Sequence, residues 1–273
     1  MTDSPDSDSS PLLEATEFEE SSVFTPEALL ESARRQKSLP ERSVPDICIL
    51  DPDGDIVRQL TATGEAHKDE AWPGYHTDLY RFERNGAEFG IVGCAVGSSF
   101  AVLVAEQLFA AGCRFLVSIT SSGQIVPKGD PPYFVLISRA LRDEGTSHHY
   151  QTTSRYATLD EDLRAPVEGA CKTVSRPVYT GATWTTDAPF RETETAIERA
   201  RSEEILAVEM EAAALYTFAE VRDVPVVCFA HVTNRMGKTD DGFEKGKANG
   251  SQDALEVIDA AATAWRSFIF TSV

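Results

Sequence analysis

The chain has 273 residues, of which 42% are hydrophobic and 25% are charged, a mixture that excludes a mini-protein, a fibre and a fully disordered chain. Asp and Glu number 44 against 25 Lys and Arg, so the formal net charge is −19, which opposes binding to nucleic acid or to an anionic membrane surface. No apolar run approaches the roughly 20 residues that span a bilayer, and the N-terminus has no signal-peptide pattern, so we expect a cytoplasmic protein.

The first 22 residues differ in composition from the rest of the chain. Residues 1–22 contain seven acidic residues, no basic residue and many serines. Such a segment cannot bury enough apolar area to offset the entropy that is lost on ordering. We therefore predict a disordered acidic tail over residues 1–22 and one folded domain over residues 23–273.

The folded part begins with a helix and continues with short apolar runs. Thr25 and Pro26 have the pattern of an N-cap followed by a first-position proline, which predicts a helix through about Gln36. The apolar runs are rich in β-branched and aromatic residues and are bounded by turn residues, which is typical of buried strands. These predicted strands cover residues 46–50, 89–93, 115–119, 133–138 and 224–230.

Helical patterns lie between several of these strands. From Ser99 to Gly112 the apolar residues recur every three or four positions, which indicates one buried helix face and, with the flanking strands, a βαβ unit. Residues 202–221 and 251–268 predict two further helices. The sum is an α/β fold, a three-layer single domain with a central mixed β-sheet flanked by helices. Ligands of such domains usually bind beyond the carboxyl ends of the strands.

The five cysteines are scattered, without a C-x-x-C pair, and several lie within apolar strand-like runs. A thiol in such a run behaves as a small buried hydrophobe, so we expect neither a disulfide framework nor a zinc site. Their positions are Cys48, Cys94, Cys113, Cys171 and Cys228.

The segment from Gly93 to Ser99 follows a predicted strand and opens a predicted helix. Its backbone N–H groups and hydroxyls are placed to face an anion, although a plain tight turn has the same pattern. The segment lacks the third glycine of a dinucleotide fingerprint and the lysine of a P-loop. A dinucleotide-binding oxidoreductase is therefore disfavoured.

Two carboxylates, Glu209 and Glu211, flank Met210 at the head of an alanine-rich helical pattern. Acids in a first helical turn can simply complement the helix dipole on a solvated face. Small residues imply close packing, however, and an acid among packed apolar residues needs a specific partner. Sugar hydroxyls are one such partner.

The order of these motifs resembles the nucleoside phosphorylase family, which includes purine nucleoside phosphorylases and uridine phosphorylases. The Glu-Met-Glu element with its alanine-rich helix is the most specific likeness. The other matching segments are residues 93–108, 121–125, 143–150, 185–191 and 233–235. The resemblance spans about residues 46–268 and implies a nucleoside phosphorylase-like catalytic domain within residues 23–273.

The resemblance implies cleavage of the N-glycosidic bond of a nucleoside, through a transition state with positive charge on the sugar ring. In the family the second acid of the Glu-Met-Glu element holds ribose hydroxyls and the methionine packs on the sugar. These roles map to Glu211 and Met210, with Glu209 as a further ribose-binding residue. A carboxylate that accepts from ribose hydroxyls orients the sugar and stabilises the developing charge, so Glu211 is predicted to be catalytic.

Asn234 and Arg235 occupy the base side of the pocket in the family pattern, and both are predicted to be catalytic. Asn234 cannot act as an acid but can donate a hydrogen bond, and Arg235 carries a permanent positive charge, a pairing closer to the uridine enzymes. A surface salt bridge is the alternative role of Arg235. Trp184 and Arg191, which border the matching segment 185–191, complete the predicted base site.

The phosphate side departs from the family pattern. Family phosphorylases hold phosphate with arginines, whereas the corresponding positions here are Ser118 and the neighbourhood of His76. Three aspartates, Asp51, Asp53 and Asp55, lie in the loop that carries a phosphate-binding arginine in the family, and they would repel a dianion unless they point away. The donors predicted to line the phosphate site are Ser98, Thr120, Ser121, Ser122 and Arg58.

His148 and His149 are adjacent, so on a strand their side chains point to opposite sides and cannot chelate one metal ion. One of them can reach the pocket, and a structural role is the alternative. We expect no metal in this protein.

The function expected from the sequence is phosphorolysis of a uridine-like or purine nucleoside to free base and (deoxy)ribose 1-phosphate. Inorganic phosphate is the co-substrate of this pentosyltransferase reaction, and we expect no cofactor. A nucleosidase that uses water and a non-catalytic nucleoside-binding protein are the alternatives. The resemblance also implies nucleoside salvage and a homo-oligomer, dimer-based or hexameric, in which neighbouring subunits complete each pocket.

Overall fold

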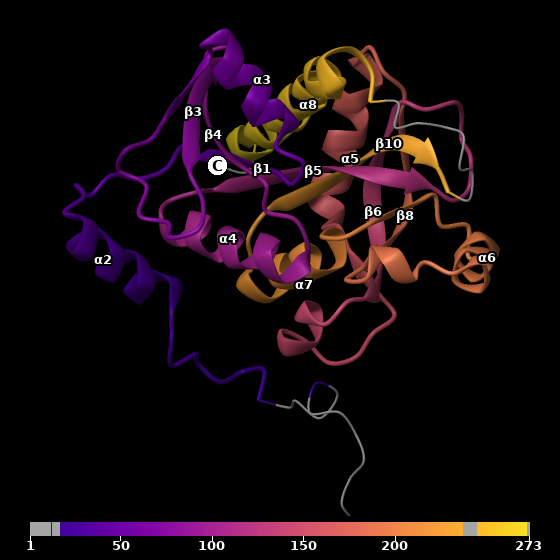
Figure 1. Cartoon of the computed structure of the whole chain (residues 1–273), viewed down its shortest axis with the longest axis horizontal. Helices are drawn as coiled ribbons and strands as arrows, with labels where there is room; N and C mark the ends of the chain where they lie inside the picture. Colours follow the sequence, from indigo (N-terminus) through magenta and orange to yellow (C-terminus); the bar gives the residue numbers. More distant parts are fainter. Residues whose placement is uncertain (1–11, 13–16, 237–244, 272–273) are drawn as a thin grey trace, which may run out of the picture.

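The computed structural model describes residue 12, residues 17–236 and residues 245–271 (Figure 1). Its strands are β1 (Ile47–Asp51), β2 (Ala66–Lys68), β3 (Leu79–Arg84), β4 (Ala87–Gly93), β5 (Phe115–Gln124), β6 (Tyr133–Asp143), β7 (Tyr156–Thr158), β8 (Val178–Thr186), β9 (Ala207–Glu209) and β10 (Val226–Arg235). Its α-helices are α2 (Pro26–Lys37), α3 (Asp55–Thr63), α4 (Ser98–Ala110), α5 (Glu161–Ala170), α6 (Glu194–Ser202), α7 (Ala212–Arg222) and α8 (Ser251–Thr271). Short 3₁₀ turns are η1 (Thr146–His149), η2 (Cys171–Thr173), η3 (Pro189–Arg191) and η4 (Lys247–Gly250).

The ten strands form one mixed sheet in the order β10-β6-β8-β9-β5-β1-β4-β3-β2, and β7 pairs with β6. Strand β1 lies parallel between β4 and β5, whereas β3 and β4 are antiparallel. Strand β5 also pairs with β10, so β5, β9, β8, β6 and β10 close on one another like a barrel. All residues of β1 are buried, as expected for a strand with parallel neighbours on both sides.

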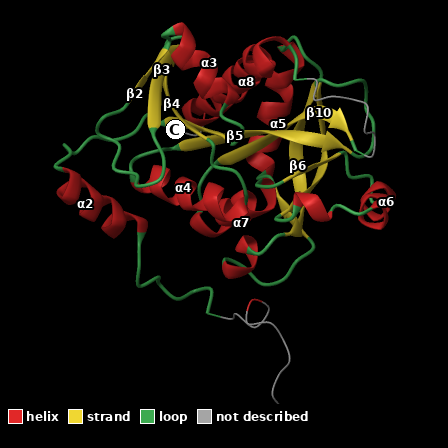
Figure 2. Ribbon diagram, in the orientation of Figure 1, coloured by secondary structure: helices red, strands yellow, loops and turns green. Residues whose placement is uncertain are grey.

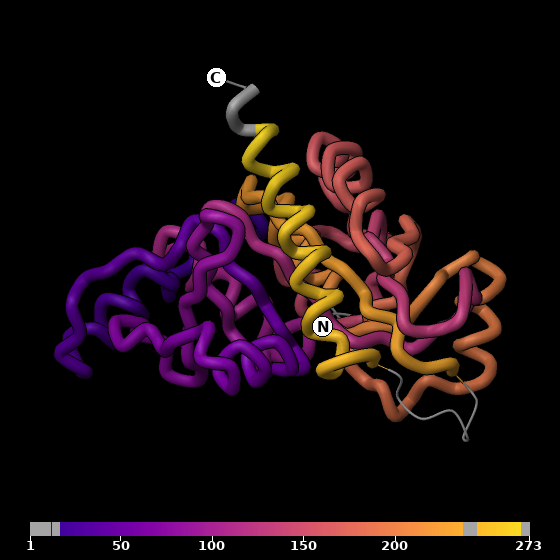
Figure 3. Tube along the Cα trace, turned by 90° about the horizontal axis from the view of Figure 1, so that it is seen from above, coloured from indigo at the N-terminus to yellow at the C-terminus, as the bar shows by residue number. Residues whose placement is uncertain are grey.

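Helices cover the sheet on both faces. Figure 2 shows α3, α5 and α8 on one face and α4 and α7 on the other. Seen from above, α8 runs across its face beside α5 (Figure 3), where Trp265 of α8 stacks on Phe115 of β5 with ring centroids 5.0 Å apart. The predicted three-layer α/β fold with a central mixed sheet is therefore confirmed.

The local signals of the sequence explain several element boundaries. The hydroxyl of Thr25 accepts a hydrogen bond from the Ala28 amide at the start of α2, and Pro26 occupies the first helical turn. Strand β4, helix α4 and strand β5 form the predicted βαβ unit, with β1 lying between the two strands. The five predicted strands are all present as β1, β4, β5, β6 and β10.

The single helix predicted over residues 202–221 is wrong. Helix α6 ends at Ser202, and a turn through Glu204, whose φ is +56°, leads into strand β9 before α7 begins. Strand β9 pairs with β8 on one side and with β5 on the other. These long-range backbone hydrogen bonds outweigh the helical preference of the local sequence.

The tail predicted over residues 1–22 lies outside the described residues apart from residues 12 and 17–22. Residues 17–22 form turns and irregular backbone. The disorder of this segment stays a prediction.

Candidate active site

The candidate site lies at the carboxyl ends of β5 and β10, beside the turn that opens α4. Strand β9 ends at Glu209 and α7 begins at Ala212, three residues later, so the Glu-Met-Glu element forms the connection between a strand and a helix. Two of its residues bond to that turn. The Gly97 amide donates to Oε1 of Glu211 over 2.7 Å, and the Ser98 hydroxyl donates to the Met210 carbonyl over 2.8 Å.

Glu211 combines deep burial with an incomplete set of hydrogen bonds. Glu211 is only 1% exposed, and its Oε2 atom has no hydrogen-bond partner among the described residues. Burial, followed by the nearby charge of Glu209, raises the pKa of Glu211 to about 8, although the Gly97 amide and the Thr120 hydroxyl act in the opposite direction. An unpartnered buried carboxylate oxygen is costly, and a bound hydroxyl would satisfy it.

Glu209 lies only two residues away but has no free acceptor. Its Oε1 accepts from the hydroxyls of Thr183 and Thr185, and its Oε2 accepts from the amides of Glu211 and Ala212, each over 2.7 Å. Burial nevertheless raises its pKa above the ordinary value. Glu209 thus caps the N-terminus of α7 from the preceding strand, and its predicted contact with ribose stays a prediction.

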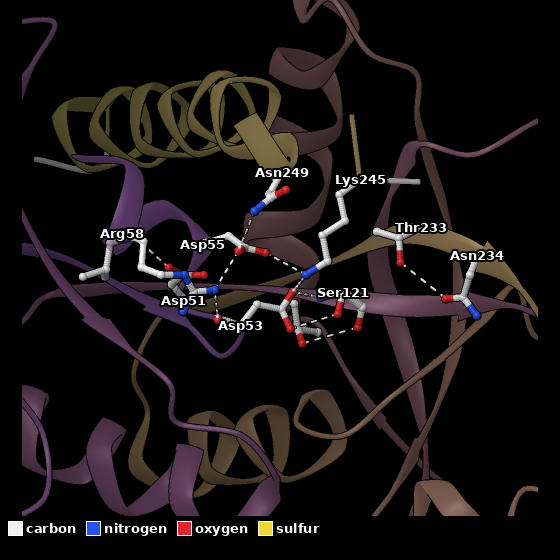
Figure 4. A network of polar contacts seen from close by, with 11 residues as sticks. Asp51, Asp53, Asp55, Arg58, Ser121, Thr233, Asn234, Lys245 and Asn249 are labelled. Atoms are coloured by element: carbon white, nitrogen blue, oxygen red, sulfur yellow. Dashed lines mark hydrogen bonds and ion pairs between the residues drawn. The ribbon is translucent and has the colours of Figure 1, made fainter. Parts of the chain in front are cut away.

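The predicted phosphate side is occupied by carboxylates (Figure 4). Ser121 donates to Asp53 through its backbone amide over 3.1 Å and through its hydroxyl over 2.9 Å. Arg58 donates to Asp55 over 2.6 Å and to the Asp53 carbonyl over 2.8 Å. Lys245 donates to both Asp53 and Asp55, over 3.1 Å and 2.6 Å. Asp53 and Asp55 therefore do not point away from the predicted phosphate donors, because Asp53 bonds to Ser121 and Asp55 bonds to Arg58.

The remaining predicted phosphate donors differ in their surroundings. Thr120 lies next to Ser121 and beside Glu211, and so connects the ribose and phosphate sides. The Ser122 hydroxyl is buried with no partner among the described residues. The Ser98 hydroxyl is engaged by the Met210 carbonyl.

Two of the predicted base residues, Asn234 and Arg235, end strand β10. Asn234 accepts a hydrogen bond from the Thr233 hydroxyl over 3.3 Å, near the end of β10 (Figure 4). Arg235 pairs with Asp130 at a cavity of about 530 Å³ that Arg201 also lines.

Trp184, which is also predicted to bind the base, bonds to a carboxylate other than Glu209 and Glu211. The indole of Trp184 donates to Asp143 over 2.8 Å, whereas Thr183 and Thr185, its neighbours on β8, bond to Glu209. Because side chains alternate along a strand, Trp184 faces away from Glu209. Arg191 lies exposed in η3.

The two adjacent histidines are in a different local structure from the one expected. His148 and His149 end the 3₁₀ turn η1 and do not lie on a strand. Burial lowers the pKa of His148. In the described residues, no group of three or more His, Cys, Asp or Glu side chains is placed to hold a metal ion.

Sequence reasoning missed Lys245 and Asn249, and with them the counter-ion of the aspartates. Asn249 donates to Asp55 over 3.3 Å, and Lys245 is 192 residues from Asp53 along the chain. Neither residue belongs to a motif. Only the closeness of the loop after β1 to the start of α8 brings them to the aspartates, so no local pattern marks them.

The comparisons with known proteins agree with this fold. A family model described as the phosphorylase superfamily matches residues 46–268. A guanosine phosphorylase of Halorubrum lacusprofundi is 24% identical over 187 residues, which cover 66% of this chain and 78% of that protein. A uridine phosphorylase of Thermococcus kodakarensis is 24% identical over 201 residues, which cover 67% of this chain and 70% of that protein.

Solved structures are similar across most of the chain. A crystal structure of uridine phosphorylase from Vibrio fischeri superposes with a TM-score of 0.69 at 18% identity, covering 84% of this chain and 96% of that one. A second structure of the Vibrio fischeri enzyme, in complex with 6-hydroxy-1-naphthoic acid, has a TM-score of 0.64 at 16% identity, covering 86% and 96%. Among the described helices, none combines the length and apolar character that crossing a membrane requires.

Proposed function

This chain belongs to the phosphorylase superfamily, and from that premise we propose that it cleaves the N-glycosidic bond of a nucleoside by phosphorolysis. A phosphate oxygen bonds to C1′ of the sugar while the bond from C1′ to the base nitrogen breaks and its electron pair leaves with the base. The products are a free base, which takes up a proton, and a (deoxy)ribose 1-phosphate. The reaction needs inorganic phosphate as co-substrate and no cofactor.

Glu211 is the observation that carries this proposal. One oxygen of its buried carboxylate is held by the Gly97 amide, and the other has no partner among the described residues. Adjacent ribose hydroxyls would donate to that oxygen. An ionised Glu211 held beside the sugar would then stabilise the positive charge that develops as the base leaves. Met210, which is half-buried, is proposed to pack on the sugar.

The substrate that we propose is a uridine-like or purine nucleoside. The two curated relatives are named as a guanosine and a uridine phosphorylase, so they support both kinds of base. Asn234 offers a hydrogen-bond donor to the base without an acidic proton. Arg235 is proposed to assist once it turns from Asp130 toward the base.

A nucleosidase is the second candidate, because the Asp53 carboxylate already accepts both hydrogen bonds that Ser121 donates on the phosphate side. Water would then replace phosphate as the nucleophile. For either reaction we propose a homo-oligomer, dimer-based or hexameric, that acts in nucleoside salvage in the cytoplasm.

A panel of nucleosides, assayed with and without inorganic phosphate, tests the proposed reaction. We expect uridine or a purine nucleoside to release free base only when phosphate is present, with a sugar 1-phosphate as the second product. Chromatography of the base and a colorimetric assay of the sugar phosphate measure both products. Glu211→Gln protein, purified in parallel, controls for phosphorylases carried over from the expression host.

The pattern of products separates the candidates. Base release at the same rate in phosphate-free buffer would identify a nucleosidase. Binding of nucleosides in calorimetry without release of any base would leave a non-catalytic binding protein.

A further inference from the structure

The carboxylate of Asp53 is surrounded by the kinds of donor that bind a phosphate oxygen. These are a backbone amide and a hydroxyl, both from Ser121, and the ammonium group of Lys245 (Figure 4). Ser121 lies in β5 and is one of the residues that the sequence assigns to phosphate. An anionic side chain therefore already fills the position in which these donors converge.

Little space is left beside this carboxylate. The adjoining cavity has a volume of about 20 Å³ and is lined by Asp53, Asp55, Thr120 and Ser121 among others. That volume accommodates about one water molecule and is too small for the four oxygens of phosphate. Phosphate can enter only after the Asp53 side chain leaves.

Buried polar groups without partners border the same cavity. His231 is 6% exposed and Ser251 is 1% exposed, and the Nε2 atom of His231 and the Oγ atom of Ser251 have no partner among the described residues. Buried polar atoms of this kind are normally satisfied. Their position indicates that the contacts seen at this site are not the complete set.

Charge also opposes the binding of phosphate beside Asp53. Among the described residues, Lys245 and Arg58 are the cations bonded to this cluster, and Asp53 and Asp55 are the carboxylates that they bond to. Adding a phosphate dianion while Asp53 stays on Ser121 places three anionic groups around Lys245. The repulsion is relieved when Asp53, which is partly exposed on the loop between β1 and α3, swings away.

We propose that Asp53 is an internal competitor of phosphate, and that phosphate binds by displacing its carboxylate from Ser121 and taking Lys245 as its cation. This proposal rests on the proposed phosphorolysis. It assigns to Lys245 the role that arginines have in the family resemblance. The two residues form an ion pair in this structure, yet they act on phosphate binding in opposite directions.

Substitution of each partner of the pair tests this opposition. Asp53→Asn removes the competing charge and should lower the KM for phosphate about tenfold, whereas Lys245→Met removes the cation and should raise it about tenfold. Lys245→Arg should restore most of the loss. Asp53→Ser serves as a second variant, because its shorter side chain cannot fill the position that the Asp53 carboxylate occupies beside Ser121.

The matched control is an ion pair remote from the site. Arg164 and Glu161 pair over 2.6 Å on α5, and Glu161→Gln and Arg164→Met should leave the KM for phosphate unchanged. If the ion pair of Asp53 and Lys245 only stabilised the fold, substitution of either residue would change the KM for phosphate in the same direction or leave it unchanged. That result with phosphorolysis intact overturns the proposal.

Calorimetric titration with inorganic phosphate alone separates this proposal from the proposed function. Tighter binding of phosphate to Asp53→Asn and weaker binding to Lys245→Met would support the phosphate site. If these variants behave so but no nucleoside is cleaved, phosphorolysis is refuted and the phosphate site is not. Asp53→Asn protein that folds but loses base release both with and without phosphate, while phosphate binding stays unchanged, overturns the proposal. Asp53 would then act on water in a nucleosidase.

Discussion

At the scale of the residue, Glu209 and Glu211 show how environment separates the roles of two identical side chains. Four donors from the protein saturate the carboxylate of Glu209. Glu211 keeps one buried oxygen without a partner among the described residues. The first arrangement stabilises the fold, and the second is suited to a ligand with hydroxyl groups.

Glu211→Gln should lower kcat on the proposed nucleoside by about a hundredfold or more, because one electrostatic contact to the transition state is lost. The folded state should be retained, since the amide oxygen can still accept from Gly97. Steady-state kinetics and circular dichroism measure both. Glu168→Gln, an exposed substitution on α5, is the matched control. Wild-type kinetics in folded Glu211→Gln protein would refute the sugar-binding role.

The pH dependence of Glu211 adds a second measurement of the same substitution. Burial raises the pKa of Glu211 from 4.5 to about 8, so the folded state holds a proton that the unfolded state has lost between these values. The contribution of this proton to the free energy of unfolding is fully present below about pH 4.5 and is lost as the pH rises through about 8. Meanwhile kcat/KM should rise toward pH 8 as the carboxylate forms. Glu211→Gln should lack both changes, and a rise in kcat/KM that persists in this variant would assign the titration to another group.

At the scale of the element, helix α7 is anchored by residues outside itself. The amides of Glu211, Ala212 and Ala213 would lack partners at its N-terminus. Glu209 of β9 accepts from the first two, and the Thr185 hydroxyl of β8 accepts from the third over 2.9 Å. The pairing of β8 with β9 thus determines where α7 begins, and with it the position of Glu211.

Glu209→Ala should reduce the free energy of unfolding by about 3 kcal/mol, because four buried donors lose their acceptor. Glu209→Gln should cost about 1 kcal/mol, since its amide oxygen can face the helix amides and its NH₂ group can donate to the threonine hydroxyls. Urea unfolding curves measure the difference. Equal stability of the two variants would show that these hydrogen bonds do not anchor α7.

At the scale of the whole molecule, net charge opposes the association of subunits and exposed apolar surface favours it. The formal net charge is −19, so copies of the chain repel at low ionic strength. Phe24, Val96 and Leu103 are 70%, 50% and 41% exposed, and a cavity of about 470 Å³ lies between α2, α4 and η1. Because α4 begins beside Glu211, a subunit bound on this side would lie close to the candidate site.

The proposed homo-oligomer should therefore become more stable as salt screens the repulsion. Light scattering coupled to size exclusion, in a series of NaCl concentrations, should give a mass of at least about twice that of the 29.8 kDa chain at moderate salt. The mass should fall toward one chain at low salt. A mass of one chain at every salt concentration, at micromolar protein, would contradict the proposed assembly.

Local patterns of the sequence were sufficient to predict much of this protein. The apolar runs that became β1, β4, β5, β6 and β10, and the N-cap at Thr25, are signals carried by a few neighbouring residues. The Glu-Met-Glu element and the motifs around it also led to the family. Such features are readable because burial and capping depend on residues that are close together in the chain.

Tertiary structure alone decided the details of the site. Residues 207–209 became strand β9 because β8 and β5 pair with it, and Glu209 became a helix cap because the hydroxyls of Thr183 and Thr185 lie opposite. Lys245 reaches Asp53 across 192 positions of the chain. Strand pairing, hydrogen-bond saturation and the meeting of distant charges depend on which segments the fold places side by side, and no local pattern specifies those neighbours.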